Sequence, residues 1–345
     1  MSKKIWIGLL VSVAALYIAL KDVQFGALVS TLSEIRYLYV LAGVILVIIL
    51  MAVRTIRWQL LLQPVKPIRF HNLYSVYMIG HMANNILPAK LGELVRVYLV
   101  GSQEKISKSA ALATMVVERL FDIGSMFAVL GFVSISFKTL DFPAWVWSGS
   151  LTIFILATVT LMILIVLTYF PPAVISFLEN RLAFLPPRLH KRILRMTESF
   201  LDGLNILRRG HVLWRVAALS VVVWGMQLIV FLMGFLAFKF YLPAAALFVL
   251  VLITSLAMAV PSSPAYIGTY QVSVIFALAL FDVGREAALG YSLVIHAMQA
   301  LPVTALGFIY AWKSHLSLKQ LSRVEIGGVD DDNIRKDNVV PFPDR

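Results

Sequence analysis

Long apolar runs recur along this chain of 345 residues, and they restrict it to one class of fold. A helix that crosses a bilayer needs about 20 predominantly apolar residues, and six runs approach or exceed that length. They are Ile5–Leu20, Tyr37–Val53, Ala110–Phe137, Trp145–Phe170, Val212–Phe238 and Ala287–Trp312. The composition agrees, because 60% of the residues are hydrophobic and 14% are charged, against about 45–50% and about 25% in soluble proteins. The sequence predicts an all-α polytopic membrane protein with about six transmembrane helices.

Two further apolar segments, at about 70–100 and about 243–281, are interrupted by proline, which lacks a backbone N–H and breaks a helix. Backbone groups freed at membrane depth are tolerated only where protein or a water-filled cavity surrounds them. We therefore predict two re-entrant helical hairpins that enter the membrane from opposite sides. The residues at the two breaks are Pro88, Gly92, Pro261, Pro264 and Gly268.

The distribution of basic residues predicts the orientation. The linker 171–211 is rich in arginine and lysine, which is typical of cytoplasmic loops. With that linker inside, both termini are also cytoplasmic. The formal net charge of +12 then fits the positive-inside rule and anionic lipid surfaces, and we expect no nucleic-acid partner.

This topology repeats with the opposite orientation. Residues 1–143 form the first membrane repeat, and residues 144–313 form the second, inverted one. Residues 314–345 are a polar cytoplasmic tail, which we expect to be largely disordered. Inverted repeats with broken helices are typical of transporters, whose substrate sites lie near the breaks at the bilayer midplane.

Charged residues follow the first break and lie within the third predicted span. Each charge at the bilayer centre costs about 3 kcal/mol on insertion scales, so these groups must pair or face a cavity. Spacing alone would pair Arg119 with Asp122 or Glu118, and Glu93 with Arg96. We expect a polar cavity instead, with these charges on its walls. The residues are Glu93, Arg96, Glu118, Arg119 and Asp122.

Other polar residues are further candidates for substrate binding. Those at the first break could hydrogen-bond the freed backbone or bind a polar headgroup. Arg54 and Arg57 end the second predicted span, where an interfacial anchor is the default interpretation and a phosphate contact the alternative. The remaining candidates are Asn84, Asn85, Lys90, His296 and Gln299.

Motifs for covalent chemistry are missing from the sequence. The chain has no cysteine, and it has no nucleotide-binding P-loop, no zinc-protease motif and no serine-hydrolase motif. We expect no metal site, no cofactor and no enzyme activity.

Four short motifs occur in a fixed order along the chain. They are Arg54-x-x-Arg57-Trp58, Asn85-x-x-Pro88-Ala89-Lys90-x-Gly92-Glu93-x-x-Arg96, Glu118-Arg119-x-x-Asp122, and Pro261-x-x-Pro264 with Gly268. With them the chain resembles the flippase-type membrane region of the lysylphosphatidylglycerol synthase family, as a stand-alone member without the synthase domain. The resemblance extends to about Lys313. Two departures are that Lys90 stands where arginine is usual and that Ala265-Tyr266 replaces usual glycines.

The resemblance implies an inner-membrane protein that moves a lipid between leaflets. We expect a phosphate-containing lipid as substrate, either a phospholipid or a polyprenyl-phosphate-linked lipid. Two alternatives are a proton-coupled transporter of a small solute and a non-transporting membrane subunit of a lipid-linked glycan pathway. Membrane lipids are the expected partners, and a glycosyltransferase or a lipid-modifying enzyme is a candidate protein partner.

Overall fold

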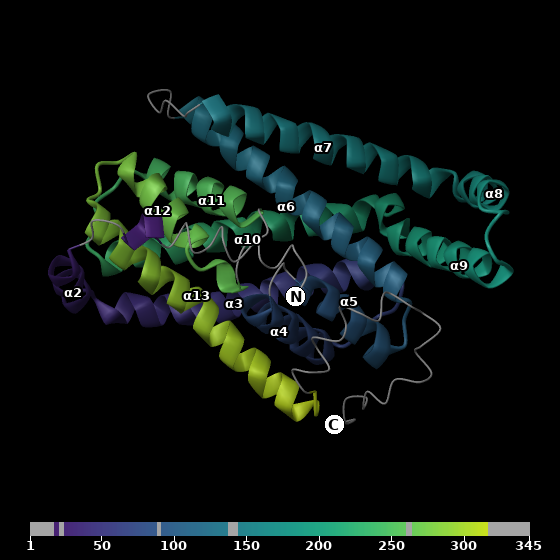
Figure 1. The fold of residues 1–345 in the computed structure, drawn as a ribbon, viewed down its shortest axis with the longest axis horizontal. Helices are drawn as coiled ribbons and strands as arrows, with labels where there is room; N and C mark the ends of the chain where they lie inside the picture. Colours follow the sequence, from purple (N-terminus) through teal and green to yellow (C-terminus); the bar gives the residue numbers. More distant parts are fainter. Residues whose placement is uncertain (1–16, 21–23, 88–90, 137–143, 260–263, 317–345) are drawn as a thin grey trace.

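The structure, a computed structural model, describes residues 17–20, 24–87, 91–136, 144–259 and 264–316 (Figure 1). Every regular element in these ranges is helical, which confirms the predicted all-α class. The elements are α2 (Phe25–Ser33), α3 (Tyr37–Leu62), α4 (Phe70–Ile86), α5 (Leu91–Glu104), α6 (Lys108–Ser136), α7 (Ala144–Tyr169), α8 (Pro171–Arg181), α9 (Pro187–Leu204), η1 (Asn205–Arg208), α10 (Gly210–Ala237), α11 (Ala244–Ala259), η2 (Pro264–Tyr266), α12 (Thr269–Ala279) and α13 (Arg285–Lys313).

Within the ranges given above, three helices, α3, α10 and α13, are long and apolar enough to cross a membrane. They have 26, 28 and 29 residues, and at about 1.5 Å per residue each exceeds the hydrocarbon thickness of about 30 Å. A fourth candidate is the pair formed by α7 and α8, which is bent by 95° after Tyr169. These helices support a multi-pass membrane protein. The total of six spans and the inverted repeat stay predictions.

Helix α3 continues to Leu62, past Val53, where the predicted second span ends. The predicted end rested on Arg54 and Arg57, which normally mark the edge of the membrane. In the structure Arg57 is fully buried, because carboxylates on α6 neutralise its charge. Arginine is also a good helix former, so the helix continues through Arg54 and Arg57.

Each predicted hairpin corresponds to two helices that pack on each other, α4 with α5 and α11 with α12. In the first pair the backbones nearly touch, since a Cβ atom at Gly92 would lie 2.0 Å from the carbonyl oxygen of Gly80. Pro88, Lys90 and Pro261 lie outside the described residues, as do most of the first predicted span and of the tail. The re-entrant character of the hairpins therefore stays a prediction.

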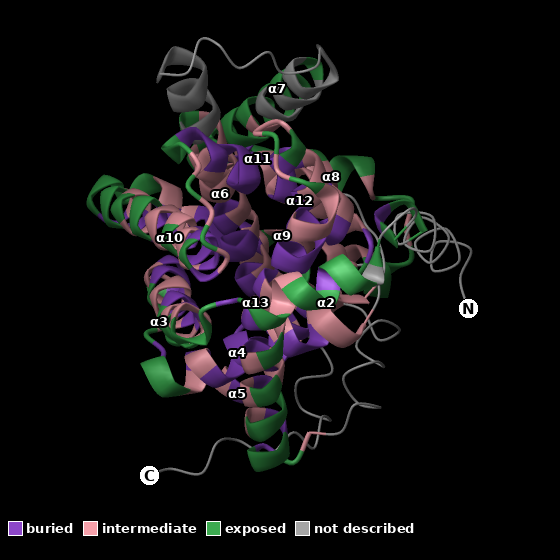
Figure 2. Ribbon diagram, turned by 90° about the vertical axis from the view of Figure 1, so that its left-hand side faces the viewer, coloured by how far each residue is buried: buried purple, intermediate pink, exposed green. Residues whose placement is uncertain are grey.

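The two halves of the chain interlock around a shared interior. Helix α10 packs along α3, and α13 packs along α4. Figure 2 shows the buried residues concentrated between these helices and α11, while much of α7 is exposed. The exposed side chains of α7 include Leu156, Met162 and Ile163, which is the pattern of a helix that faces lipid. In the linker, α9 packs against α6.

Candidate substrate cavity

A cavity of about 420 Å³ lies between the two halves of the chain. Helices α3, α4, α5 and α6 line one side of it, and α10, α11, η2, α12 and α13 line the other. The predicted site residues from both halves therefore meet at one place. The first-half side is charged, and the second-half side is polar but uncharged.

Glu118 on α6 is the centre of a buried ion-pair network. Its Oε1 lies 3.0 Å from Nη2 of Arg57, and its Oε2 lies 2.9 Å from Nη2 of Arg96. The hydroxyl of Tyr77 donates to Oε1 at 3.4 Å. Glu118 and Arg96 are 0% exposed and Arg57 is 1% exposed, so none of these charges is solvated. The network holds together α3, α4, α5 and α6 at the cavity wall, where Arg57 and Tyr77 line the cavity and Arg96 and Glu118 lie behind them.

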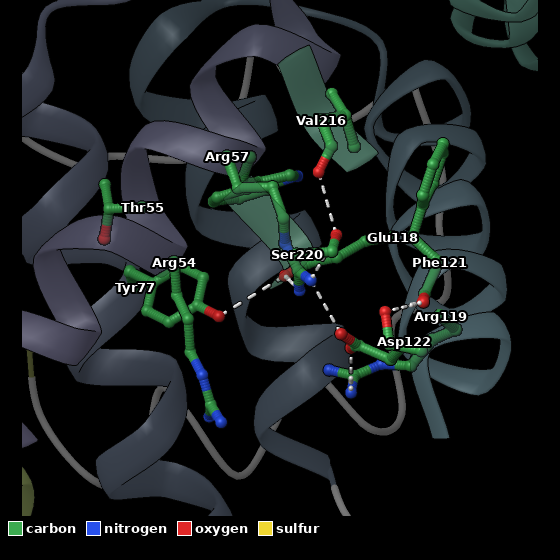
Figure 3. Close-up of polar contacts among 12 residues, drawn as sticks. Arg54, Thr55, Arg57, Tyr77, Glu118, Arg119, Phe121, Asp122, Val216 and Ser220 are labelled. Carbon is green, nitrogen blue, oxygen red and sulfur yellow. Dashed lines mark hydrogen bonds and ion pairs between the residues drawn. The ribbon is translucent and has the colours of Figure 1, made fainter. Parts of the chain in front are cut away.

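Arg57 extends the network toward the cavity (Figure 3). Its Nη1 donates to Oδ1 of Asp122 at 2.7 Å and to the hydroxyl of Ser220 on α10 at 3.1 Å. One guanidinium therefore contacts two carboxylates on α6 and the second half of the chain. An arginine suits this position because its planar fork donates several hydrogen bonds in fixed directions.

Arg119 and its two partners form the exposed edge of the network. Its Nη2 lies 2.9 Å from Oε1 of Glu93, and its Nη1 lies 3.3 Å from Oδ2 of Asp122. The side chains are 42%, 24% and 17% exposed for Arg119, Glu93 and Asp122, and all three line the cavity. These charges can meet a ligand, whereas Arg96 and Glu118 cannot.

Arg96 is held between aromatic rings. Its guanidinium carbon lies 4.2 Å from the ring centroid of Trp58 and 4.1 Å from that of Tyr77, which is cation–π geometry. A Cβ atom at Gly80 would lie 2.1 Å from Cγ of Arg96, so this position leaves room for glycine alone. Trp58 is itself fixed by a 3.2 Å hydrogen bond from Nε1 to Oγ1 of Thr114. Arg96 thus has a structural position rather than a cavity position.

The second-half wall is a row of hydrogen-bonded neutral groups. Gln227 on α10 donates to Oε1 of Gln299 on α13 at 3.0 Å, and Gln299 donates to the hydroxyl of Tyr270 on α12 at 3.1 Å. Beside this row, Nε2 of Gln271 lies 3.1 Å from Nδ1 of His296. Gln227, Tyr270, His296 and Gln299 line the cavity, and no charged residue of the second half does so among the described residues.

The two asparagines near the first break have different surroundings. Nδ2 of Asn85 donates to Oγ1 of Thr304 at 2.8 Å and lies 3.4 Å from the carbonyl oxygen of Ala300, so it ties α4 to α13. Oδ1 of Asn84 is buried and has no hydrogen-bond partner among the described residues. Both residues line the cavity.

After the second break, Gly268 has a φ of 91°, which only glycine adopts readily, and its N–H donates to Oε1 of Gln271 at 2.7 Å. Glycine therefore serves here as the start of α12. Pro264 begins η2, whose Ala265 and Tyr266 both have positive φ.

Three sequence predictions are corrected by the structure. Arg96 and Glu118 lie behind the cavity wall rather than on it, and Glu118, not Glu93, pairs with Arg96. Arg57 is no interfacial anchor, because it is buried at the centre of the network. Of the pairings expected from spacing, Arg119 with Asp122 is confirmed.

Sequence reasoning also missed residues that the structure brings to the site. The missed residues are Tyr77, Ser220, Gln227, Tyr270 and Gln271. Gln227 had a signal, because it is a polar residue within an otherwise apolar helix. Within the part of the chain that the structure describes, no cluster of three or more histidine, aspartate or glutamate residues is placed to hold a metal ion.

Fold and cavity together define a polytopic α-helical membrane protein with a charged cavity between two sets of helices. Residues 5–307 match the family described as the lysylphosphatidylglycerol synthase TM region, and the chain belongs to this family. A UPF0104 membrane protein of Methanocaldococcus jannaschii is 24% identical over 286 residues, which are 79% of this chain and 83% of that protein. Another, of Methanothermobacter thermautotrophicus, is 28% identical over 117 residues, 33% of this chain and 35% of that protein. No solved structure matches the chain significantly.

Proposed function

We propose that this protein moves a phosphate-containing lipid between the leaflets of the cell's inner membrane, with the headgroup passing through the cavity. The observation that supports this most directly is the mixed lining of the cavity. Arg54, Arg119, Glu93 and Asp122 line it together with apolar side chains. Its volume of about 420 Å³ is within the range of about 300–1,000 Å³ that holds a small ligand.

A lipid presents both kinds of surface at its headgroup. The phosphate needs charge-assisted hydrogen bonds, which guanidinium groups supply in the right planar geometry. The first atoms of the tails need apolar contacts, which Met51, Met126, Phe231 and Met258 offer in the same cavity. The exposed apolar helix α7 is consistent with a protein surrounded by lipid.

The test is flipping of tail-labelled phospholipids in proteoliposomes, followed by quenching of the outer leaflet. The informative variant is Glu93→Gln with Arg119→Gln. The two charges neutralise each other at 2.9 Å, so removing both leaves neither unpaired, and Asp122 keeps its contact with Arg57. We expect this variant to remain folded and to flip lipid at least about tenfold more slowly, a barrier increase of about 1.4 kcal/mol.

The matched control is Lys66→Gln with Glu104→Gln, a pair at 3.0 Å that does not line the cavity. It should flip lipid at the wild-type rate. If the variant without the Glu93–Arg119 pair flipped lipid at the wild-type rate, the pair would have only a structural role. Wild-type protein that accelerates no lipid, but takes up a small solute with protons, would support the alternative transporter instead.

We also propose that both termini are cytoplasmic. The chain has no cysteine, so a single introduced cysteine can be labelled without background. Ser317→Cys should be protected from an impermeant reagent in intact cells and should react after permeabilisation. Labelling in intact cells would contradict the orientation.

A further inference from the structure

Arg54 differs from the other three arginines at the site. Each of those has a carboxylate oxygen within 3.0 Å. Among the described residues, the one hydrogen bond of the Arg54 side chain goes to a neutral amide, from its Nη2 to Oε1 of Gln227 at 3.5 Å. Figure 3 shows its side chain apart from the contacts of Arg57 with its partners. Arg54 also lines the cavity. Arg54 is therefore a cation that faces a ligand space without a carboxylate of its own.

The charges around the cavity add up accordingly. In the described part of the site, four guanidinium groups face three carboxylates, which leaves one positive charge. All three carboxylates already accept from arginine. A bound amine would have to share a carboxylate whose charge an arginine already neutralises, whereas an anion finds in Arg54 a cation without a carboxylate partner. In a site of low dielectric, an unpaired cation favours a ligand with one negative charge.

Arg54 contacts the first residue of the neutral second-half wall. Gln227 contacts Arg54 and continues the row to Gln299 and Tyr270. Amide and phenol groups both donate and accept hydrogen bonds, and so do hydroxyl groups. A headgroup with hydroxyls can therefore exchange hydrogen bonds with this row without bringing a second charge.

We infer that the substrate is a phosphodiester lipid with a single negative charge and an uncharged, hydroxyl-bearing headgroup. Arg54 binds its phosphate, and the row Gln227, Gln299 and Tyr270 binds its hydroxyls. This inference rests on the proposed function, since it names the substrate class of the same cavity.

The experiment compares four tail-labelled lipids that differ only in the headgroup. Phosphatidylglycerol is an anionic diester with hydroxyls, phosphatidylethanol is an anionic diester without them, phosphatidylethanolamine adds an amine, and phosphatidic acid is a monoester. We expect phosphatidylglycerol to flip at least about tenfold faster than each of the other three lipids. A tenfold difference corresponds to the loss of about one hydrogen bond to a charged group, or of several neutral hydrogen bonds.

Variants assign the two parts of the headgroup to the two groups of residues. Arg54→Gln should slow phosphatidylglycerol at least about tenfold, and Arg54→Lys should restore part of the rate because it keeps the charge. Gln299→Leu should leave the flipping rate of phosphatidylethanol unchanged. It should slow the flipping of phosphatidylglycerol to about the rate of phosphatidylethanol. The control is Arg209→Gln, an exposed arginine outside the cavity, which should change none of these rates.

Equal flipping of all four lipids, or a preference for phosphatidylethanolamine, would overturn the substrate class and leave the flippase proposal intact. Flipping of no lipid would overturn the flippase proposal. Binding separates the two cases further, because phosphatidylglycerol should raise the melting temperature of the detergent-solubilised wild type and not that of Arg54→Gln. Equal stabilisation by water-soluble glycerophosphoglycerol would assign the site to a free phosphodiester rather than to a lipid.

Discussion

The two walls of the cavity offset the cost of burying polar groups in a membrane by different interactions. The first-half wall, from α3, α5 and α6, uses full charges, and all of them except Arg54 are paired with an opposite charge before any ligand arrives. The second-half wall, from α10, α12 and α13, uses neutral amides and a phenol that hydrogen-bond one another. A buried charge pair loses much of its hydration and must be complete to be tolerated, while a neutral hydrogen bond can be exchanged at little cost.

The difference suggests a division of labour. The charged wall behaves as a rigid frame, because removing one charged group leaves its buried partners with too little countercharge. The neutral wall can change partners as a headgroup passes. The comparison predicts that stability depends mainly on the first half of the chain and headgroup selection mainly on the second half and Arg54.

The largest effect should follow Glu118→Gln. This change removes the carboxylate shared by Arg57 and Arg96, which are 1% and 0% exposed. Among the described residues, Arg96 then loses its one carboxylate partner and Arg57 loses one of its two. Because both arginines lie in a dry interior, we expect a loss of about 3–5 kcal/mol in the free energy of unfolding. Titration with a denaturing detergent measures it.

Glu34→Gln is the control, because Glu34 pairs with Lys239 at 4.0 Å and is 74% exposed. An effect below about 0.5 kcal/mol is expected there. If Glu118→Gln were as mild as this control, the charged wall would not be the frame of the site.

Gly92→Ala should come next. The added Cβ would lie 2.0 Å from the backbone oxygen of Gly80 and 2.5 Å from the backbone nitrogen of Asn84, so no side-chain rotation relieves the clash. Helices α4 and α5 must move apart, at a cost of about 2–3 kcal/mol. Gly124→Ala on α6 meets no atom within 4 Å and should be neutral or slightly stabilising. A stable Gly92→Ala protein with normal flipping would show that the frame tolerates displacement.

The sequence predicted much of this frame, for reasons that are local. Apolar runs and proline breaks show the helices, and charge within such runs is expensive enough to mark Glu93, Arg96, Glu118, Arg119 and Asp122 as a site. Spacing of three residues along one helix correctly gave Arg119 with Asp122. The same rule failed for Glu93 with Arg96, because Arg96 turns toward α6.

Contacts between helices far apart in the sequence were much harder to predict. Arg57 and Glu118 are 61 residues apart, and Gln227 and Gln299 are 72 apart, so their contacts depend on how helices pack rather than on sequence spacing. Tyr270 and Gln271 carry no charge and therefore little insertion cost. Nothing in a single sequence distinguishes such residues from other polar residues of an apolar helix.

A smaller effect is expected for Gln299→Leu on the neutral wall. Gln299 accepts from Gln227 and donates to Tyr270, and leucine leaves both without that partner. The cavity can supply water to them, so we expect a loss of about 1–2 kcal/mol in the free energy of unfolding. The same denaturation titration measures it. A loss as large as that of Glu118→Gln would contradict the division between the two walls.

The smallest effect concerns the tip of the second half, where Ala265 has a φ of 53°. This left-handed conformation costs a residue with a Cβ about 1–2 kcal/mol. Glycine avoids that cost, but it loses more conformational entropy on folding. The difference predicts that Ala265→Gly stabilises the protein by about 0.5–1 kcal/mol. Ala257→Gly in α11 is the matched control, and the loss of helix propensity should destabilise it by about as much. Opposite signs for the two substitutions would locate backbone strain in the neutral wall, beside the cavity that Ala265 lines. If both variants lost the same free energy of unfolding, Ala265 would not be strained, and ion pairing would be the main physical difference between the two walls.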